Sequence, residues 1–428
     1  MRTKIVPILC GISLGVLILG AQYVFTSSNH TTLPKNNMIP ATPALLELQK
    51  NIAKAPSHDL YITMGNTYLQ LVRESNNATL YQLAEESANN AATLKPNSSE
   101  VLSLLASVSL GRHDFKKSLN YIEKAIEINS EVAMYYGIRG DALIELGRYT
   151  EAVSAYQTMI DRRPDFNSFN RIAYARELYG DIVGAQEALR HASQAGSSNK
   201  KDLAWIETEL GRLSLPSNLN TAKNHYNNAE KISPNYAPAQ AGLSHVAFFE
   251  QDMKKAEAFA LSAFELLPTS ENATLLGDIF YSLNEPKKAE QYYVLAELAY
   301  ENSEKLGINI DVEYAQFLIE RERRIDEAQP RAARAQEIRP NAIARDNIAW
   351  ALYQQGKYQE AQKVIADTLD TTKSIGAYNA KILYHSGLIA LKNQDNVKAQ
   401  ELLEASIATN QHFSIRDITK RTDALKNL

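Results

Sequence analysis

The chain has 428 residues, of which 45 are basic and 49 acidic, for a formal net charge of −4. A chain with this charge and no basic stripe is not typical of nucleic-acid binding, so we expect no nucleic-acid partner. The one cysteine, Cys10, excludes a disulfide framework or a thiolate zinc site within one chain, and the eight histidines have no metal-ligand spacing. No motif of a catalytic nucleophile or a phosphate loop occurs, so we expect no enzyme and no catalytic, metal or cofactor-binding residue.

The first 26 residues predict a membrane-targeting segment. Arg2 and Lys4 precede an uncharged run from residue 5 to residue 25, about 21 residues, which is long enough to cross a bilayer. We favour a retained signal-anchor, and a cleaved signal peptide is the alternative. Because the basic residues lie on the short N-terminal side, we expect the rest of the chain outside the cytoplasm. It would be attached to the inner (cytoplasmic) membrane, or periplasmic or secreted after cleavage.

Residues 27–41 are polar and predict a flexible linker after the membrane-targeting segment. Thr42 then has the side chain of a helix N-cap, and Pro43 suits the first helical position. Residues 42–56 therefore predict a helix that caps the N-terminal end of the remaining chain.

Residues 135–164, YYGIRGDALIELGRYTEAVSAYQTMIDRRP, show a unit that is repeated along the chain. Apolar residues recur three and four positions apart in two stretches, which predicts two amphipathic helices. Gly147 separates the two helices, and Pro164 ends the second because proline cannot continue a helix. Gly140 and Ala152 lie where the helices face each other, and only small side chains allow the backbones to approach closely. The unit is therefore predicted to be an antiparallel helix pair.

The position of Ala152, called here the alanine slot, recurs at intervals of 33 to 39 residues. The slot residues are Ala84, Ser118, Ala152, Ala185, Ala222, Ala256, Ala289, Ala328, Ala361 and Ala399. Four positions later most copies have a larger packing residue: Ile122, Tyr156, Leu189, Tyr226, Tyr293, Ile365 and Leu403. Twelve positions before the slot, six copies carry another small residue: Ala106, Gly140, Ala173, Gly277, Ala349 and Gly387. The pattern predicts about ten copies of one helix pair.

This arrangement of small, aromatic and proline positions in a unit of about 34 residues resembles the tetratricopeptide repeat family. Together with the membrane-targeting segment, the chain resembles such proteins of the bacterial envelope. The resemblance implies an all-α fold, a right-handed superhelical solenoid of about ten stacked helix pairs, because one pair cannot bury its apolar face alone. We expect the solenoid over residues 42–412, including the N-terminal capping helix, and a C-terminal capping helix over residues 413–428.

The resemblance also implies where a partner would bind. In the family, a peptide or helix of another protein lies in the concave groove, against fixed positions of the first helix of each pair. In this chain those positions hold Asn167, Asn170, Tyr174, Asp278, Tyr281, Asp346, Trp350, Tyr353 and Tyr384. The aromatic residues at 350, 353 and 384 favour an interface, because folding does not need aromatics there and aromatics anchor interfaces. Packing of Trp350 against the next repeat or the C-terminal cap is the alternative.

Arginine is dense in residues 321–340, RERRIDEAQPRAARAQEIRP. The arginines are interleaved with Asp and Glu, which predicts solvated helix faces with ion pairs between residues four apart. A basic patch in the groove is the alternative interpretation.

Together these features indicate a protein that holds other proteins. The leading hypothesis is a non-catalytic interaction scaffold, tethered to the membrane and facing outside the cytoplasm, that assists assembly of an envelope or export complex. The alternative is a soluble periplasmic binding or chaperone module after signal cleavage. An enzyme or regulatory subunit is a third hypothesis, for which no motif argues.

Overall fold

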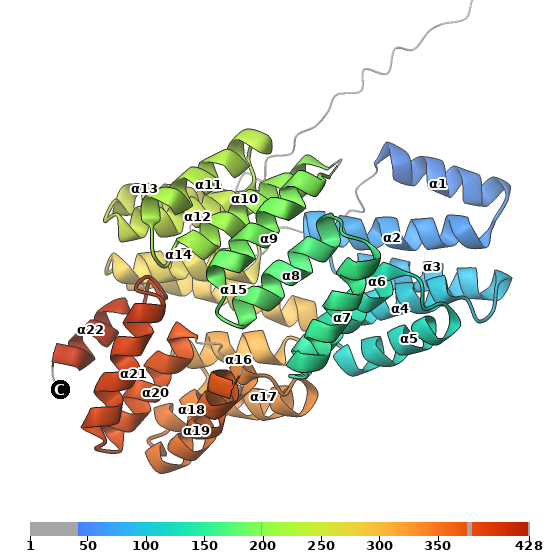
Figure 1. Cartoon of the computed structure of the whole chain (residues 1–428). Coiled ribbons are helices and arrows are strands. Elements are labelled where there is room, and N and C mark those ends of the chain that lie inside the picture. The colour runs from blue at the N-terminus through green and yellow to red at the C-terminus, as the bar shows by residue number, and fades with distance from the viewer. Residues whose placement is uncertain (1–41, 198, 375–378, 427–428) are drawn as a thin grey trace, which may run out of the picture.

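The computed structural model describes residues 42–197, 199–374 and 379–426, so the expected membrane segment and linker lie outside the described residues. All regular secondary structure in these ranges is helical (Figure 1). The helices are α1 (Pro43–Lys54), α2 (His58–Ser75), α3 (Leu80–Leu94), α4 (Ser99–Gly111), α5 (Phe115–Ile128), α6 (Ala133–Glu145), α7 (Tyr149–Arg162), α8 (Phe166–Leu178), α9 (Ile182–Ala195), α10 (Lys200–Ser214), α11 (Leu219–Ile232), α12 (Ala237–Phe249), α13 (Met253–Leu266), α14 (Ser270–Ser282), α15 (Pro286–Lys305), α16 (Asp311–Glu320), α17 (Ile325–Ile338), α18 (Ala342–Gln354), α19 (Tyr358–Ser374), α20 (Ala380–Lys392), α21 (Asn396–Thr409) and α22 (Ile418–Lys426).

Consecutive helices pack as ten pairs, from α2 with α3 to α20 with α21, and each pair packs on the next. The prediction of an all-α superhelical solenoid of about ten pairs is therefore confirmed. Helix α1 packs on α2 ahead of the first pair. It begins at Pro43 with Thr42 as its N-cap, as expected, because the Thr42 hydroxyl accepts a hydrogen bond from the Leu45 N–H at 3.2 Å. The side of the solenoid formed by the first helices of the pairs, such as α6, α8, α14 and α16, is called here the inner face.

The close approach of the two helices in a pair depends on the predicted small residues. All ten residues of the alanine slot are at most 2% exposed. A Cβ atom added at Gly140 would lie 2.3 Å from the Tyr156 ring, and one added at Gly277 would lie 2.3 Å from the Tyr293 ring. Real Cβ atoms do not approach other atoms so closely, so each tyrosine packs directly on the glycine backbone.

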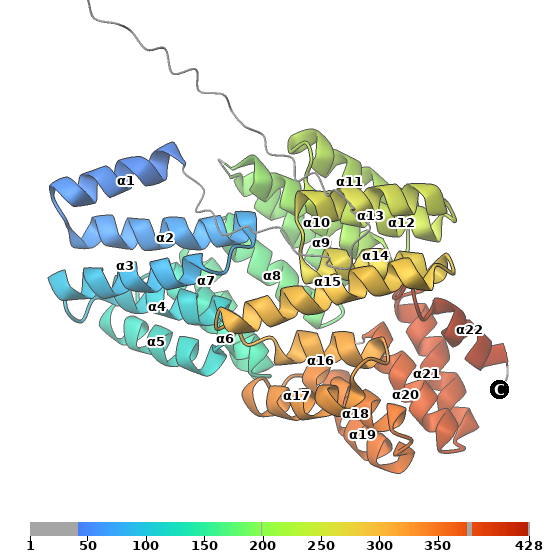
Figure 2. The same ribbon diagram turned by 180° about the vertical axis from the view of Figure 1, so that it is seen from behind.

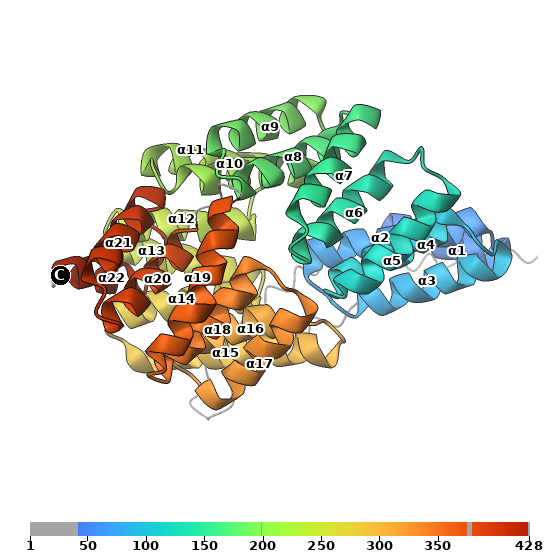
Figure 3. The ribbon, with the colours of Figure 1, turned by 60° about the horizontal axis from the view of Figure 1, so that its bottom comes forward.

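The solenoid winds far enough for later repeats to touch earlier ones (Figure 3). The Asn309 N–H donates to the Arg112 carbonyl at 3.0 Å, which joins the segment after α15 to the turn after α4. Figure 2 shows α15 crossing the back of the molecule toward α4 and α6. Lys116 of α5 donates to the Glu337 carbonyl of α17 at 3.1 Å, and Arg339 pairs with Glu145 of α6. Consecutive turns of the superhelix are thus in direct contact.

Four of the six arginines in residues 321–340 are largely buried and do not lie on the solvated helix faces expected from the sequence, whereas Arg324 and Arg334 are exposed. Arg321 is 7% exposed and pairs with Asp278 of α14, and Arg331 is 10% exposed and pairs with Asp311 of α16. Only one of their ion pairs, Arg331 with Glu327, joins residues four apart. Most of the carboxylates come instead from neighbouring helices, such as Asp278 of α14 and Glu145 of α6, so these arginines tie repeats together. Within this segment, which the structure describes throughout, they leave no free basic patch.

The chain after α21 differs from the expected capping helix over residues 413–428. Residues 411–417, called here the C-terminal segment, contain no helix, and the last helix begins only at Ile418. The Ser414 hydroxyl accepts a hydrogen bond from the Asp417 N–H at 3.1 Å, which turns the chain before that helix.

Candidate functional site

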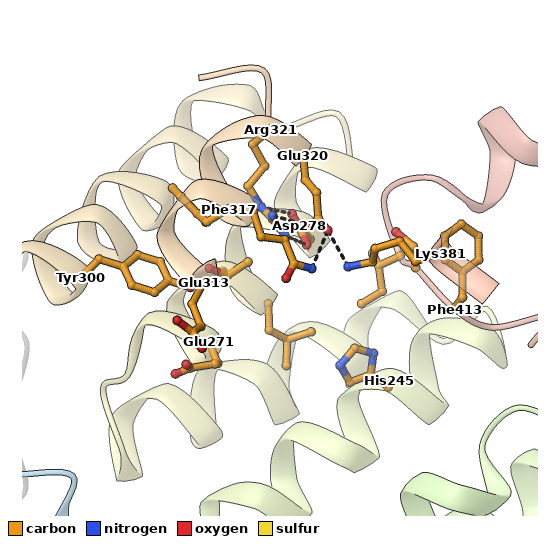
Figure 4. A pocket seen from close by; sticks show the side chains of 15 residues that line it. His245, Glu271, Asp278, Tyr300, Glu313, Phe317, Glu320, Arg321, Lys381 and Phe413 are labelled. Atoms are coloured by element: carbon orange, nitrogen blue, oxygen red, sulfur yellow. Dashed lines mark hydrogen bonds and ion pairs between the residues drawn. The ribbon is translucent and has the colours of Figure 1, made fainter. Parts of the chain in front are cut away.

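Two cavities of about 330 Å³ each lie on the inner face. The first, called the α8 cavity, lies among α4, α6 and α8, and Arg339 from the next superhelical turn closes one side of it. The second, called the α16 cavity, lies among α12, α14 and α16, with Lys381 of α20 and residues 413–415 at its edge (Figure 4). Both cavities therefore combine side chains from repeats that are distant in sequence.

A triad of Asp, Tyr and Arg contributes to the wall of the α8 cavity. The Tyr156 hydroxyl donates to the Asp141 carboxylate at 2.9 Å, and Arg171 of the next repeat pairs with the same carboxylate at 2.7 Å. Asp141 is positioned by its neighbour Gly140, which lets the Tyr156 ring come close enough for its hydroxyl to reach the carboxylate. Burial, together with the Asp141 charge, raises the pKa of Tyr156 well above its usual value, so the phenol stays protonated as a donor.

The same triad recurs at the α16 cavity. Tyr293 donates to Asp278 at 2.8 Å, and Arg321 pairs with Asp278 at 2.6 Å. Here Gly277 precedes the aspartate, as Gly140 precedes Asp141. In both places a Gly-Asp pair, a tyrosine in the packing position and a later arginine fix a partly buried carboxylate on the inner face. The saturated carboxylates indicate a structural role for both triads.

Glu320 is the most strongly held acid at the α16 cavity. Its carboxylate accepts from Lys381 at 2.5 Å, from Arg321 at 3.1 Å and from Gln316 at 2.8 Å (Figure 4). Burial alone would raise the pKa of Glu320, but the charges of Lys381 and Arg321 outweigh burial and lower this pKa to about 2. Glu320 thus joins α16 to α20 as a carboxylate at neutral pH.

Three of the predicted partner-binding residues lie together on α8 and are accessible. Asn167 is exposed, Tyr174 is 42% exposed, and Tyr174 lines the α8 cavity. Asn170 is half-buried, and its side-chain oxygen has no hydrogen-bond partner in the structure. The three residues are spaced three and four apart, so they share one face of the helix.

Two further predicted residues lie on α14. Asp278 lines the α16 cavity, but its carboxylate is engaged by Tyr293 and Arg321. Tyr281 is 43% exposed, and the Arg416 guanidinium lies over its ring at 3.8 Å from the centroid. The C-terminal segment therefore covers part of the predicted surface.

The remaining predicted residues are placed mostly inside the protein, which corrects the expectation of an accessible surface. Asp346 is 3% exposed, and His385 donates to its carboxylate at 2.8 Å. Trp350 is 8% exposed and stacks on the rings of Tyr353 and His385, with centroids 4.3 and 4.0 Å away. Tyr384 is 1% exposed and packs on Phe413 of the C-terminal segment, and only Tyr353 is half-buried. Trp350 is therefore packed in the core, as the alternative interpretation predicts, and Tyr384 is buried as well.

The repeat pattern does not predict the contribution of the C-terminal segment to the α16 cavity. Phe413, Ser414 and Ile415 line this cavity although they follow the last repeat. The signal in the sequence was the alternation of Phe413 and Ile415 with polar residues, which does not fit a helical period.

Within the described residues, no helix combines the length and the apolar character needed to cross a membrane. In the same part of the chain, no group of three or more His, Cys, Asp or Glu side chains could hold a metal ion.

Family models describe two parts of the chain as tetratricopeptide repeats, residues 103–165 and residues 342–375. A mouse (Mus musculus) protein, tetratricopeptide repeat protein 21A, is 21% identical over 264 residues. The match covers 56% of this chain, which spans only about 20% of the mouse protein.

Among solved structures, yeast Tom70 matches 90% of this chain and 91% of its own, with 13% identity and a TM-score of 0.38. The pilF protein of Pseudomonas aeruginosa matches 49% of this chain and 92% of its own, with 19% identity and a TM-score of 0.37.

Proposed function

Because this chain is a tetratricopeptide repeat protein, we propose that it is a non-catalytic scaffold that binds a peptide or helix of a partner protein at the inner face of α8. We further propose that the protein is tethered to the membrane by residues 1–26, faces outside the cytoplasm, and assists assembly of an envelope or export complex. The uncharged run of residues 5–25 behind two basic residues supports the tether.

One observation carries the binding site: Asn167 and Tyr174 are exposed on one helical face, which also carries the half-buried Asn170, and Tyr174 lines a cavity of about 330 Å³. An asparagine side chain can both donate to and accept from a peptide backbone, so two asparagines suit a main-chain ligand. The side-chain oxygen of Asn170 is buried without a hydrogen-bond partner, and a ligand toward which this side chain turns would satisfy it. Tyr174 adds a large contact area with few rotatable bonds, as interface aromatics do.

Site-specific cross-linking of the full chain in bacteria tests this proposal. A photoreactive amino acid in place of Tyr174 should form a discrete adduct with one partner protein, and Asn167→Ala with Asn170→Ala should reduce that adduct. The control places the same photoreactive residue at Val183 of α9, which is 76% exposed but lies away from the α8 cavity. Equal adducts from both positions would contradict a binding site on α8.

The membrane tether has a test of its own. The full chain should sediment with the inner membrane and stay there in high salt, because a retained apolar span is held by lipid and not by charge. N-terminal sequencing of the mature protein reports the alternative: a new N-terminus near Gln22 or Asn29 would replace the tethered scaffold by a soluble periplasmic binding or chaperone module.

A further inference from the structure

The C-terminal segment, residues 411–417, is a non-helical run of turns and bends that lies against helices preceding it by more than a hundred residues. The His412 ring nitrogen donates to the Leu215 carbonyl, after α10, at 2.9 Å. The His412 ring also packs on Phe249 of α12, with centroids 4.7 Å apart. The segment therefore enters the inner face between α10 and α12 as soon as it leaves α21.

The next residues of the segment fill the inner face in the way a bound peptide would. Phe413 packs on Tyr384 with centroids 5.2 Å apart, and Ile415 is 6% exposed within the apolar core cluster of α14 to α16. Arg416 lies over the Tyr281 ring at 3.8 Å and donates to the Tyr293 hydroxyl at 3.2 Å. An aromatic, an aliphatic and a cationic side chain thus each contact the protein.

The fit of the segment is incomplete. The Nε of Arg416 is buried without a hydrogen-bond partner, and among the described residues no carboxylate pairs with its guanidinium. The α16 cavity stays open beside residues 413–415, and one of its walls carries Glu271, an exposed carboxylate with no ion pair in the described part of the chain. A buried donor without an acceptor weakens the hold of a group on its site.

The two ends of the segment are tied independently of its middle. The buried side chain of Arg421, on α22, donates to the carbonyls of Asn410 and Gln411, at 2.9 Å each. The Arg421 N–H donates to the Asp417 carbonyl at 2.9 Å. Residues 412–416 can therefore lift as a closed loop while α22 stays in place.

We propose that residues 411–417 are an intramolecular ligand of the inner face, and that an external peptide with the same chemistry displaces them. That chemistry is an aromatic residue, an aliphatic residue two positions later and an arginine directly after it. The external arginine would take the place of Arg416 over the Tyr281 ring. The inference rests on the proposed function in that it treats the inner face as a peptide site, but it concerns α12 to α16 and not α8.

A labelled peptide provides the test. The probe is a fluorescent peptide with the sequence of residues 410–418, NQHFSIRDI, added to the full chain. Ile415→Asp with Arg416→Glu in the protein should weaken the internal contact and strengthen peptide binding by about tenfold or more, since a tethered competitor acts at a high effective concentration. Peptide carrying Arg416→Glu, or Tyr281→Ala added to the protein variant, should abolish binding.

Two controls make the result decisive. Circular dichroism and a melting curve establish that the variant is folded, and a folded variant that does not bind the peptide overturns the proposal. If the variant does not fold, hydrogen exchange of the unmodified chain tests the proposal instead. Amides of residues 412–416 should exchange faster than those of α20, and the added peptide should raise their exchange further. Exchange as slow as in α20 would make the segment a fixed part of the core.

The two proposals can fail separately. Loss of cross-linking at Tyr174 with intact peptide displacement would contradict only the proposed site on α8. Failure of displacement with intact cross-linking would contradict only the proposal that residues 411–417 are an internal ligand.

Discussion

At the scale of single residues, Glu320 shows how the inner face holds a charge away from water. Its side chain is only 12% exposed, yet it stays ionised because Lys381 and Arg321 both contact its carboxylate. Such a group is costly to leave without its partners, since a buried charge then has nothing to replace its hydration. The pair with Lys381 also joins α16 to α20, which are 61 residues apart at the contact.

The depressed pKa of Glu320 predicts a specific dependence of stability on pH. Its pKa falls from an ordinary value of 4.5 when unfolded to about 2 when folded, so folding favours the ionised form. The stabilisation is therefore complete above pH 4.5 and is lost as the pH falls from 4.5 toward 2. Melting temperatures of wild type and Glu320→Gln should differ most above pH 4.5 and converge toward pH 3. A difference that stays constant from pH 6 to pH 3 would contradict this linkage.

At the scale of elements, the helix pair is the unit that determines stability. Ala152 of α7 is fully buried against α6, so Ala152→Leu should overpack the pair and lower the free energy of unfolding by about 1 to 3 kcal/mol. Because repeats stabilise their neighbours, hydrogen exchange should rise across residues 101–189 and not only in α7. The matched control is Ser154→Leu on the exposed side of α7, which should change little. Unchanged protection in Ala152→Leu would mean that the pairing of α6 with α7 is wrong.

The helix pairs could be predicted from the sequence because their determinants are local. The alanine slot and the packing residue four positions later lie on one helix, so their spacing alone indicates which face is buried. Tyr384 could not be placed in this way. It occupies an inner-face position of its repeat, and it is buried because Phe413, which follows the last repeat, packs on it.

The arginines of residues 321–340 likewise show that contacts between repeats cannot be predicted from the pattern of a single helix. The expected spacing of four residues along one helix fits the pair of Arg331 with Glu327. It could not identify Asp278 as the partner of Arg321, because that pair forms between repeats and depends on how the helices stack. On α8, by contrast, Asn167 and Tyr174 are accessible where the family pattern placed them, although Arg339 of the next superhelical turn lines the cavity beside Tyr174.

At the scale of the whole molecule, two glycines allow the energy of contacts between turns of the superhelix to be measured separately from the backbone strain of a left-handed residue. Gly147 has a φ of +72°, and a Cβ added there would lie 2.8 Å from the Pro340 carbonyl oxygen of the next turn. Gly356 has a nearly identical φ of +75°, but nothing lies within 4 Å of an added Cβ. Both glycines end the first helix of their pair, so they are matched in sequence context.

Alanine at either glycine should cost about 1 to 2 kcal/mol, because a side chain resists the left-handed conformation. Gly147→Ala should lose about 1 kcal/mol or more in addition, since it also presses on the neighbouring turn. Urea unfolding of the two variants measures the difference. Equal losses would show that the contact between turns adds nothing to stability.

The same contacts between turns affect how the protein is made. In most solenoids every contact is between neighbouring repeats, so contact order is low and each repeat can fold as it leaves the ribosome. Here hydrogen bonds join residues 196 and 221 positions apart. The turn after α4 lacks its partner until Asn309 has been synthesised, and the turn after α6 lacks its partner until Pro340 has been synthesised. Closing of the superhelix is therefore a late step of biogenesis, and until then the α8 cavity is open on the side that Arg339 later covers.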